Sequence, residues 1–116
     1  MTYTMYHNPN CSKSRKTLEI LRSRGAETKI IEYLKNPPSK GELQDILVKL
    51  NILPKDLIRF KDEKAKELGI SYENEFSFDH WISILVENPK LIERPIVISN
   101  ERAVIGRPPE NVISLF

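Results

Sequence analysis

Cysteine and histidine are scarce in this sequence, and their scarcity excludes several classes of protein. Cys11 is the only cysteine among 116 residues, so the chain can form no internal disulfide and has no Cys-x-x-Cys redox centre. His7 and His80 are the only histidines, too few for a structural zinc site even with Cys11. We therefore expect no metal and no resident cofactor. Any disulfide at Cys11 must involve a thiol from another molecule.

A strong charge of one sign and long apolar runs are also missing. Eighteen Lys and Arg residues oppose sixteen Asp and Glu residues, which leaves a net charge of +2, whereas nucleic-acid-binding domains usually carry a clear basic stripe. No apolar run approaches the roughly 20 residues of a membrane helix. The first six residues lack the charged start and apolar stretch of a signal peptide. We expect one soluble cytoplasmic domain over residues 1–116, with neither nucleic acid nor a membrane as partner.

Apolar periodicity and turn residues predict a mixed α/β chain. The predicted strands are 2–6, 28–33, 95–99 and 103–105, and the predicted helices are 12–24, 39–50, 54–59, 62–68, 78–86 and 110–116. Ser39 and Glu42 form a capping-box pattern, and Gly25 and Gly69 follow predicted helix ends. The order β-α-β, then β-β-α, is that of a thioredoxin-like fold with a mixed four-stranded sheet. Residues of about 36–90 form a helical insertion within it.

Cys11 falls between the first predicted strand and the first predicted helix, where several features favour a thiolate. A helix N-terminus carries about half a positive charge and several free N–H groups. The neighbouring hydroxyls and cations are Ser12, Lys13, Ser14, Arg15 and Lys16, and His7 lies just upstream as a further donor. Cations in a first helical turn oppose the helix dipole unless an anion binds there. The segment therefore indicates a nucleophilic thiol within an anion site.

Two other interpretations of Cys11 are weaker. A lone cysteine is usually a small buried apolar residue, with the charges nearby forming a solvated helix face. Its position at a strand-to-helix junction makes that interpretation less favourable here. A phosphatase loop would need an arginine six residues after the cysteine, and that position is Thr17.

Four segments together resemble the ArsC family of arsenate reductases, in order and in spacing. They are His7-Asn8-Pro9-Asn10-Cys11-Ser12-Lys13-Ser14-Arg15-Lys16-Thr17-Leu18, Tyr33-Leu34-Lys35-Asn36-Pro37-Pro38, Leu91-Ile92-Glu93-Arg94-Pro95-Ile96-Val97, and Ile105-Gly106-Arg107-Pro108-Pro109-Glu110. The resemblance covers essentially the whole chain. Ser12-Lys13 stands where typical members have Gly-Thr, so the chain is similar to an ArsC-like subgroup.

The resemblance implies both the chemistry and the residues that perform it. Cys11 would be the nucleophile that forms a thiol-arsenate adduct. The residues implied to hold the oxyanion are Arg59, Arg94 and Arg107, with Ser14 and His7 as further substrate-binding groups. Glutathione would be the co-substrate and glutaredoxin the partner that reduces the resulting mixed disulfide. A thioredoxin-like fold also implies a cis bond before Pro95, beside the cysteine.

Two alternatives remain open from the sequence. One is a non-enzymatic regulator like the Spx proteins, which share this fold and bind RNA polymerase. Those proteins commonly carry Cys-x-x-Cys, whereas Ser14 holds the second position here. The other is a general glutathione-dependent thiol oxidoreductase, which a single thiol would suit. The presence of Arg94 and Arg107 favours an oxyanion substrate over this second alternative.

Overall fold

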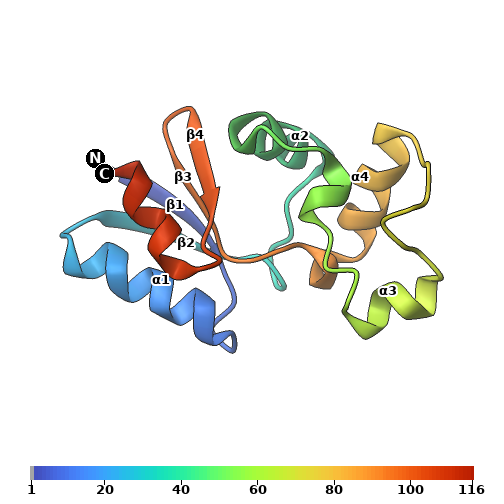
Figure 1. The fold of residues 1–116 in the computed structure, drawn as a ribbon. Coiled ribbons are helices and arrows are strands. Elements are labelled where there is room, and N and C mark those ends of the chain that lie inside the picture. The colour runs from blue at the N-terminus through green and yellow to red at the C-terminus, as the bar shows by residue number, and fades with distance from the viewer. Residues whose placement is uncertain (1) are drawn as a thin grey trace. The chain divides into compact units, whose positions relative to one another are not determined.

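A computed structural model describes residues 2–116 and separates them into two compact units. Unit 1 contains the described residues up to Asn36 together with Arg94–Phe116, and unit 2 is Pro37–Glu93. The sequence predicts a helical insertion at about 36–90, the region in which unit 2 lies. Figure 1 shows the course of the chain through both units.

Unit 1 is built on a mixed four-stranded sheet in the order β2-β1-β3-β4. Its strands are β1 (Thr2–His7), β2 (Glu27–Glu32), β3 (Ile96–Ser99) and β4 (Arg102–Ile105). β1 pairs with β2 in parallel, while β1–β3 and β3–β4 are antiparallel. The parallel pair is the one expected from the β-α-β crossover, because a connection of this length suits parallel strands.

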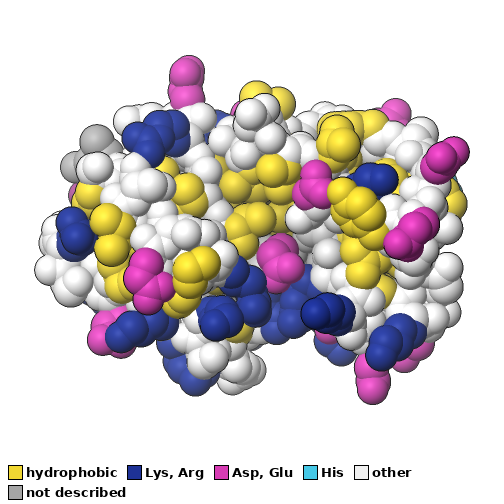
Figure 2. Space-filling model, viewed as in Figure 1, with side chains coloured by type: hydrophobic (Ala, Val, Ile, Leu, Met, Phe, Trp, Pro, Cys, Tyr) yellow, Lys and Arg dark blue, Asp and Glu magenta, His cyan; other side chains and the backbone are white. Residues whose placement is uncertain are grey.

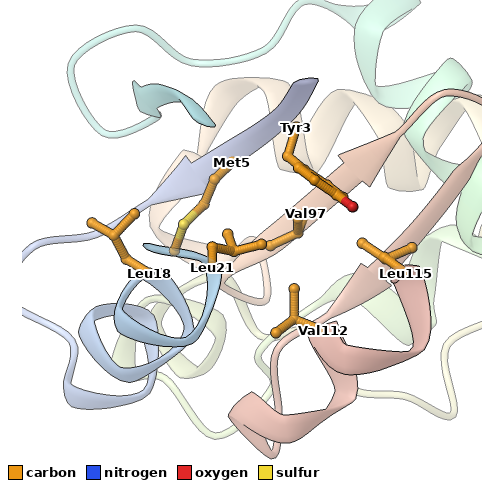
Figure 3. Packing of buried hydrophobic residues seen from close by; sticks show 7 residues of the cluster. All are labelled: Tyr3, Met5, Leu18, Leu21, Val97, Val112 and Leu115. Atoms are coloured by element: carbon orange, nitrogen blue, oxygen red, sulfur yellow. The ribbon is translucent and has the colours of Figure 1, made fainter. Parts of the chain in front are cut away.

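One helix and one 3-10 helix cover a single face of this sheet. The amphipathic helix α1 (Ser12–Ser23) and the C-terminal η3 (Pro109–Leu115) each contribute apolar side chains to a shared core. That core contains Tyr3, Met5, Leu18, Leu21, Val97, Val112 and Leu115, which point toward one another in Figure 3. The β-α-β and β-β-α order around one mixed sheet is the thioredoxin-like topology, so the predicted fold class is confirmed.

Unit 2 is helical and has its own buried side chains. It contains α2 (Lys40–Leu50), η1 (Pro54–Leu57), α3 (Glu63–Leu68), α4 (Phe78–Glu87) and η2 (Pro89–Leu91). The predicted capping box is present: Glu42 N–H donates to Ser39 Oγ at 3.2 Å, and Ser39 N–H donates to Glu42 Oε1 at 2.9 Å. Trp81 is buried against Phe60 and Phe76.

Some predicted elements differ from those observed. Residues 54–57 and 109–115 form 3-10 helices rather than α-helices. Both segments begin with proline, which has no N–H to donate to a backbone hydrogen bond. The first strand, predicted over 2–6, extends to His7, which pairs with Glu32 of β2.

The surface of the described residues carries scattered apolar side chains. In unit 2 the exposed large ones include Val48, Leu53, Tyr72 and Phe78, and hydrophobic side chains are visible over the helices of this unit in Figure 2. Among residues 2–116, no helix has both the length and the apolar character needed to span a membrane.

Candidate active site

Cys11 occupies the N-cap position of α1, directly after a turn that follows β1. Its N–H donates to the carbonyl oxygen of Asn8 at 3.0 Å, and its own carbonyl accepts the N–H of Arg15 at 3.0 Å. Its backbone is extended, as at an ordinary N-cap, but its sulfur makes no capping hydrogen bond of standard geometry. The residue is only 8% exposed. The thiol therefore lies at the positive end of a three-turn helix, where the first N–H groups favour a charged sulfur.

Opposing influences act on the pKa of the Cys11 thiol. Burial is the largest single one and raises this pKa, because a charged sulfur loses water. The N–H of Ser14, the Arg94 side chain and the N–H of Lys13 lower the pKa, and the charge of Arg94 lowers it further. Together these donors outweigh burial, so the pKa of Cys11 lies below its ordinary value. This direction agrees with the predicted thiolate.

Two arginines from the C-terminal part of the chain approach the sulfur within unit 1. Arg107 Nη2 lies 3.8 Å from Cys11 Sγ, and Arg107 Nε donates to the carbonyl oxygen of Arg94 at 2.9 Å. Arg94 is half-buried, and its Nε atom is buried without a hydrogen-bond partner among the described residues. This buried N–H, on an arginine that favours the Cys11 thiolate, offers a ready donor to a bound oxyanion.

A hydrogen bond joins His7 and Ser14, the two further substrate-binding residues that the sequence suggests. His7 Nδ1 and Ser14 Oγ are 2.7 Å apart, and Ser14 Oγ also accepts the N–H of Asn8 at 3.0 Å. Burial lowers the pKa of His7, and the charges of Arg22 and Arg15 lower it further, against a raising influence from Glu32. A neutral His7 can accept the Ser14 proton. The pair thus joins the end of β1 to the first turn of α1.

The cations at the start of α1 lie mainly on the surface. Lys13, Arg15 and Lys16 are exposed, and Lys and Arg side chains are visible around the start of α1 in Figure 2. Arg15 Nη1 donates to the carbonyl oxygen of Pro9 at 2.9 Å, so this guanidinium braces the loop before Cys11. Arg94 is a cation that lowers the pKa of Cys11, whereas the sequence suggested the helix's own cations.

The predicted cis bond is found between Arg94 and Pro95, and Arg107-Pro108 is a second cis bond that was not predicted. The carbonyl oxygen of Pro95 accepts the N–H of Gly106 at 2.8 Å. This hydrogen bond joins the segments that carry the two arginines. The position of Pro95 beside the sulfur stays a prediction.

Arg59, the third arginine implied by the resemblance, lies in unit 2 and has carboxylate partners there. Its Nη1 is 3.4 Å from Asp62 Oδ2, and its Nε is 3.6 Å from Glu93 Oε1. The N–H of Lys64 is the largest influence on the pKa of Asp62, and it outweighs burial, so this pKa is lowered with help from Lys90 and Arg59. The oxyanion-binding role of Arg59 stays a prediction.

Sequence reasoning missed three residues that shape this site. Gly106 lies so close to Thr17 that a Cβ atom there would meet Thr17 Oγ1 at 2.5 Å. Asn111 Nδ2 donates to two carbonyl oxygens of the segment that carries Arg107. A glycine directly after a strand is a known sign of close backbone approach. Thr17 and Asn111 give no comparable signal, because their contacts are long-range in sequence or depend on the final turn.

A buried thiol at a helix start, flanked by two arginines, defines a nucleophilic, anion-attracting site in a thioredoxin-like fold. The sequence matches the ArsC family over residues 6–115, and the chain belongs to that family.

Individual relatives agree with this assignment. An arsenate reductase of Neisseria meningitidis is 41% identical over 109 residues, which are 93% of this chain and 92% of that protein. The uncharacterized protein YfgD of Escherichia coli K12 is 43% identical over 112 residues, which are 96% of this chain and 93% of that protein. The solved structure of an arsenate reductase from Vibrio cholerae has a TM-score of 0.95 at 41% identity, covering 100% of this chain and 98% of that one.

Proposed function

We propose that this chain reduces arsenate to arsenite, with Cys11 as nucleophile and with glutathione and glutaredoxin supplying the electrons. The observation that carries the proposal is the placement of Arg107 Nη2 at 3.8 Å from Cys11 Sγ, beside a thiol whose pKa is lowered by Arg94. Similarity to arsenate reductases at about 40% identity over nearly the whole chain supports the substrate.

The first step is an attack by the Cys11 thiolate on arsenic. A sulfur–arsenic bond forms and one oxygen leaves as hydroxide or, after protonation, as water. The guanidinium groups of Arg94 and Arg107 hold the remaining oxygens, since an arginine fork can bond two oxygens of a tetrahedral anion. A fixed positive charge in a buried site stabilises the charge that develops in this step.

The second step transfers two electrons to arsenic. The glutathione sulfur attacks Cys11 Sγ, a sulfur–sulfur bond forms, and the pair of the broken sulfur–arsenic bond stays on arsenic as arsenite. A glutaredoxin thiolate then attacks the glutathione sulfur of the mixed disulfide and releases the Cys11 thiolate. An outside thiol is required because the sequence has no second cysteine. Such thiol chemistry suits a reducing compartment such as the cytoplasm.

Steady-state kinetics test the proposal directly. Arsenate-dependent NADPH oxidation is measured with glutathione, glutaredoxin and glutathione reductase, for the parent and for Arg94→Lys and Arg107→Lys. Lysine keeps the charge but loses the planar fork, so each variant should lose about 10-fold or more in kcat/KM for arsenate. Arg24→Lys, at an exposed position of unit 1, is the matched control and should keep the parent's activity.

The outcomes distinguish the alternatives. If both arginine variants reduce arsenate like the parent, the arginines are structural and the proposal fails. An inactive parent that still reduces a glutathione mixed disulfide would be a general thiol oxidoreductase. Thermal melts of each variant show whether a loss of activity is a loss of folding.

A further inference from the structure

Arg107 lies on a short segment, residues 105–108, that runs from the last residue of β4 to η3. The backbone of this segment is tied to the start of β3, because the N–H of Gly106 donates to the carbonyl oxygen of Pro95 at 2.8 Å. The N–H of Arg107 donates to the carbonyl oxygen of Ile105 at 2.9 Å, which closes a tight turn. The direction of the Arg107 side chain therefore depends on how this turn is held.

One side of the turn is packed as closely as a chain allows. A Cβ atom on Gly106 would lie 2.5 Å from Thr17 Oγ1 and 2.7 Å from Pro95 Cγ. Thr17 is fully buried on α1, and its hydroxyl donates to the carbonyl oxygen of Lys13 at 2.8 Å. The turn therefore cannot move closer to α1, and hydrogen bonds such as the one from Gly106 N–H to Pro95 keep it from moving away.

Asn111 provides two further hydrogen bonds to this turn. Its Nδ2 atom donates to the carbonyl oxygen of Ile105 at 3.2 Å and to that of Arg107 at 3.0 Å. One amide nitrogen thus spans the two residues that flank Gly106. Only the nitrogen end can do this, because both partners are acceptors. The N–H of Asn111 also donates to the carbonyl oxygen of Pro108 at 3.0 Å, so the residue itself is fixed to the end of the turn.

We propose that Asn111 is a positioning residue, whose side-chain amide holds the 105–108 turn so that Arg107 reaches the Cys11 sulfur. Arg107 has two observed contacts that depend on this turn: Nε with the carbonyl oxygen of Arg94, and Nη2 with Cys11 Sγ. Releasing the turn would let the guanidinium leave the sulfur. The inference rests on the proposed function only where it concerns the substrate, since the contact with the thiol does not involve arsenate.

The test measures the reactivity of the Cys11 thiol first and the KM for arsenate second. The alkylation rate of Cys11 is measured against pH for the parent, Asn111→Ala, Asn111→Leu and Arg107→Ala. Leucine keeps the shape of asparagine and removes its donors. Both Asn111 variants should raise the midpoint of the profile by about 0.5 pH unit, because a guanidinium near the sulfur favours the thiolate. Glu110→Ala, an exposed neighbour on η3, is the matched control and should leave the midpoint within the experimental error.

A double-variant cycle separates positioning from a general structural role. Adding Asn111→Ala to Arg107→Ala should not shift the midpoint further, because Asn111 acts through Arg107. The KM for arsenate should rise several-fold in Asn111→Ala, with a smaller change in thermal stability. An unchanged midpoint in the folded Asn111 variants, or an equal shift with and without Arg107, overturns the proposal. A parent that does not reduce arsenate contradicts the proposed function alone, because the alkylation profile still decides the role of Asn111.

Discussion

At the scale of single residues, the Cys11 thiol is held in a balance between burial and hydrogen-bond donors. Burial disfavours the charged sulfur, whereas the N–H groups of Lys13 and Ser14 and the side chain of Arg94 favour it. The pKa is lowered, so the donors prevail. The same donors would not be satisfied equally well by a neutral thiol. The stability of the fold is therefore coupled to the charge on this one atom.

This coupling predicts how the free energy of unfolding depends on pH. Because the folded pKa of Cys11 lies below the value in the unfolded chain, the thiolate stabilises the fold. The contribution is fully present above the ordinary thiol pKa and is lost as the pH falls through the lowered pKa. Each unit of lowering is worth about 1.4 kcal/mol. The stability of the parent relative to Cys11→Ser should therefore rise with pH over this window.

Urea unfolding under reducing conditions, from about pH 5 to about pH 9.5, measures the effect across the thiol titration. Serine stays neutral throughout, so the other titrating groups cancel in the difference. The slope should be smaller in an Arg94→Gln background, which lacks one of the two guanidinium groups near the sulfur. A flat difference between the parent and Cys11→Ser would show that the thiol has the same pKa in the folded and the unfolded chain, which contradicts the prediction.

Gly106 gives a second prediction at this scale. Gly106→Ala places a Cβ atom against Thr17 and Pro95, so it should lower the free energy of unfolding by about 1–3 kcal/mol, as overpacking does. Gly41→Ala is the control, because a Cβ there meets nothing within 4 Å and lies in the helix α2. That change should stabilise the fold by up to about 1 kcal/mol. Equal urea midpoints for the two variants would contradict the close packing of Gly106.

The sequence predicts the residues of this site unevenly, for physical reasons. Cys11 follows from local signals, since a strand, a turn and a helix start are all visible near it. Arg94 and Arg107 come only from the resemblance, because 96 residues separate Arg107 from the sulfur it contacts and no local pattern spans that gap. Asn111 could not be predicted, since its partners are backbone oxygens whose positions depend on the folded turn.

At the scale of elements, α1 carries the reactive thiol at its N-terminus and packs its apolar face into the core of unit 1. Its first turn contains no acidic residue, and its buried side chains are Ser14, Thr17, Leu18 and Leu21. The polar members of this set lie toward the cysteine, and the leucines lie in the core of unit 1. Apolar burial farther along the helix therefore holds α1 in place. The N–H groups of its first turn can then donate to the sulfur.

α2 allows a prediction about helix capping. Ser39→Ala removes the acceptor for the N–H of Glu42 and should lower the free energy of unfolding by about 0.5–2 kcal/mol. Trp81, the only tryptophan, is buried in the same unit and reports the transition by fluorescence. Ser23→Ala, at the exposed end of α1, is the control and should change stability less. Identical transitions for both variants would mean that the capping box contributes nothing in solution.

Helix types were harder to predict than helix positions. The predicted stops at Gly25 and Gly69 are confirmed, and both glycines have positive φ values of 70° and 66°. A left-handed residue after a helix suits glycine, so this signal is local. The 3-10 character of residues 54–57 and 109–115 was missed, because apolar spacing alone does not separate one short helix type from another.

At the scale of the whole molecule, the thiol and the two arginines near it lie in one unit, and the two units differ in the sign of their net charge. Unit 1 contains Cys11, Arg94 and Arg107 and has an excess of basic residues, whereas unit 2 has an excess of acidic ones. The net charge of +2 conceals this division. A basic unit that carries the thiol suits an anionic substrate, because charge focused near a site raises the local concentration of counter-ions.

Arg59 gives the last prediction, because it tests whether unit 2 has a part in the chemistry. Its guanidinium lies between Asp62, which is 10% exposed, and Glu93. Arg59→Ala leaves these carboxylates with one cation fewer, and it should lower the free energy of unfolding followed by Trp81 by about 1–3 kcal/mol. Arg59→Lys keeps a charge between the carboxylates and should lose less. Lys61→Ala, at an exposed neighbouring position, should change the Trp81 transition little.

Arsenate kinetics of the well-folded Arg59→Lys variant then separate the two roles of Arg59. A large fall in kcat/KM supports the oxyanion role that the ArsC resemblance implies. An unchanged kcat/KM assigns Arg59 to the ion pairs of unit 2 alone.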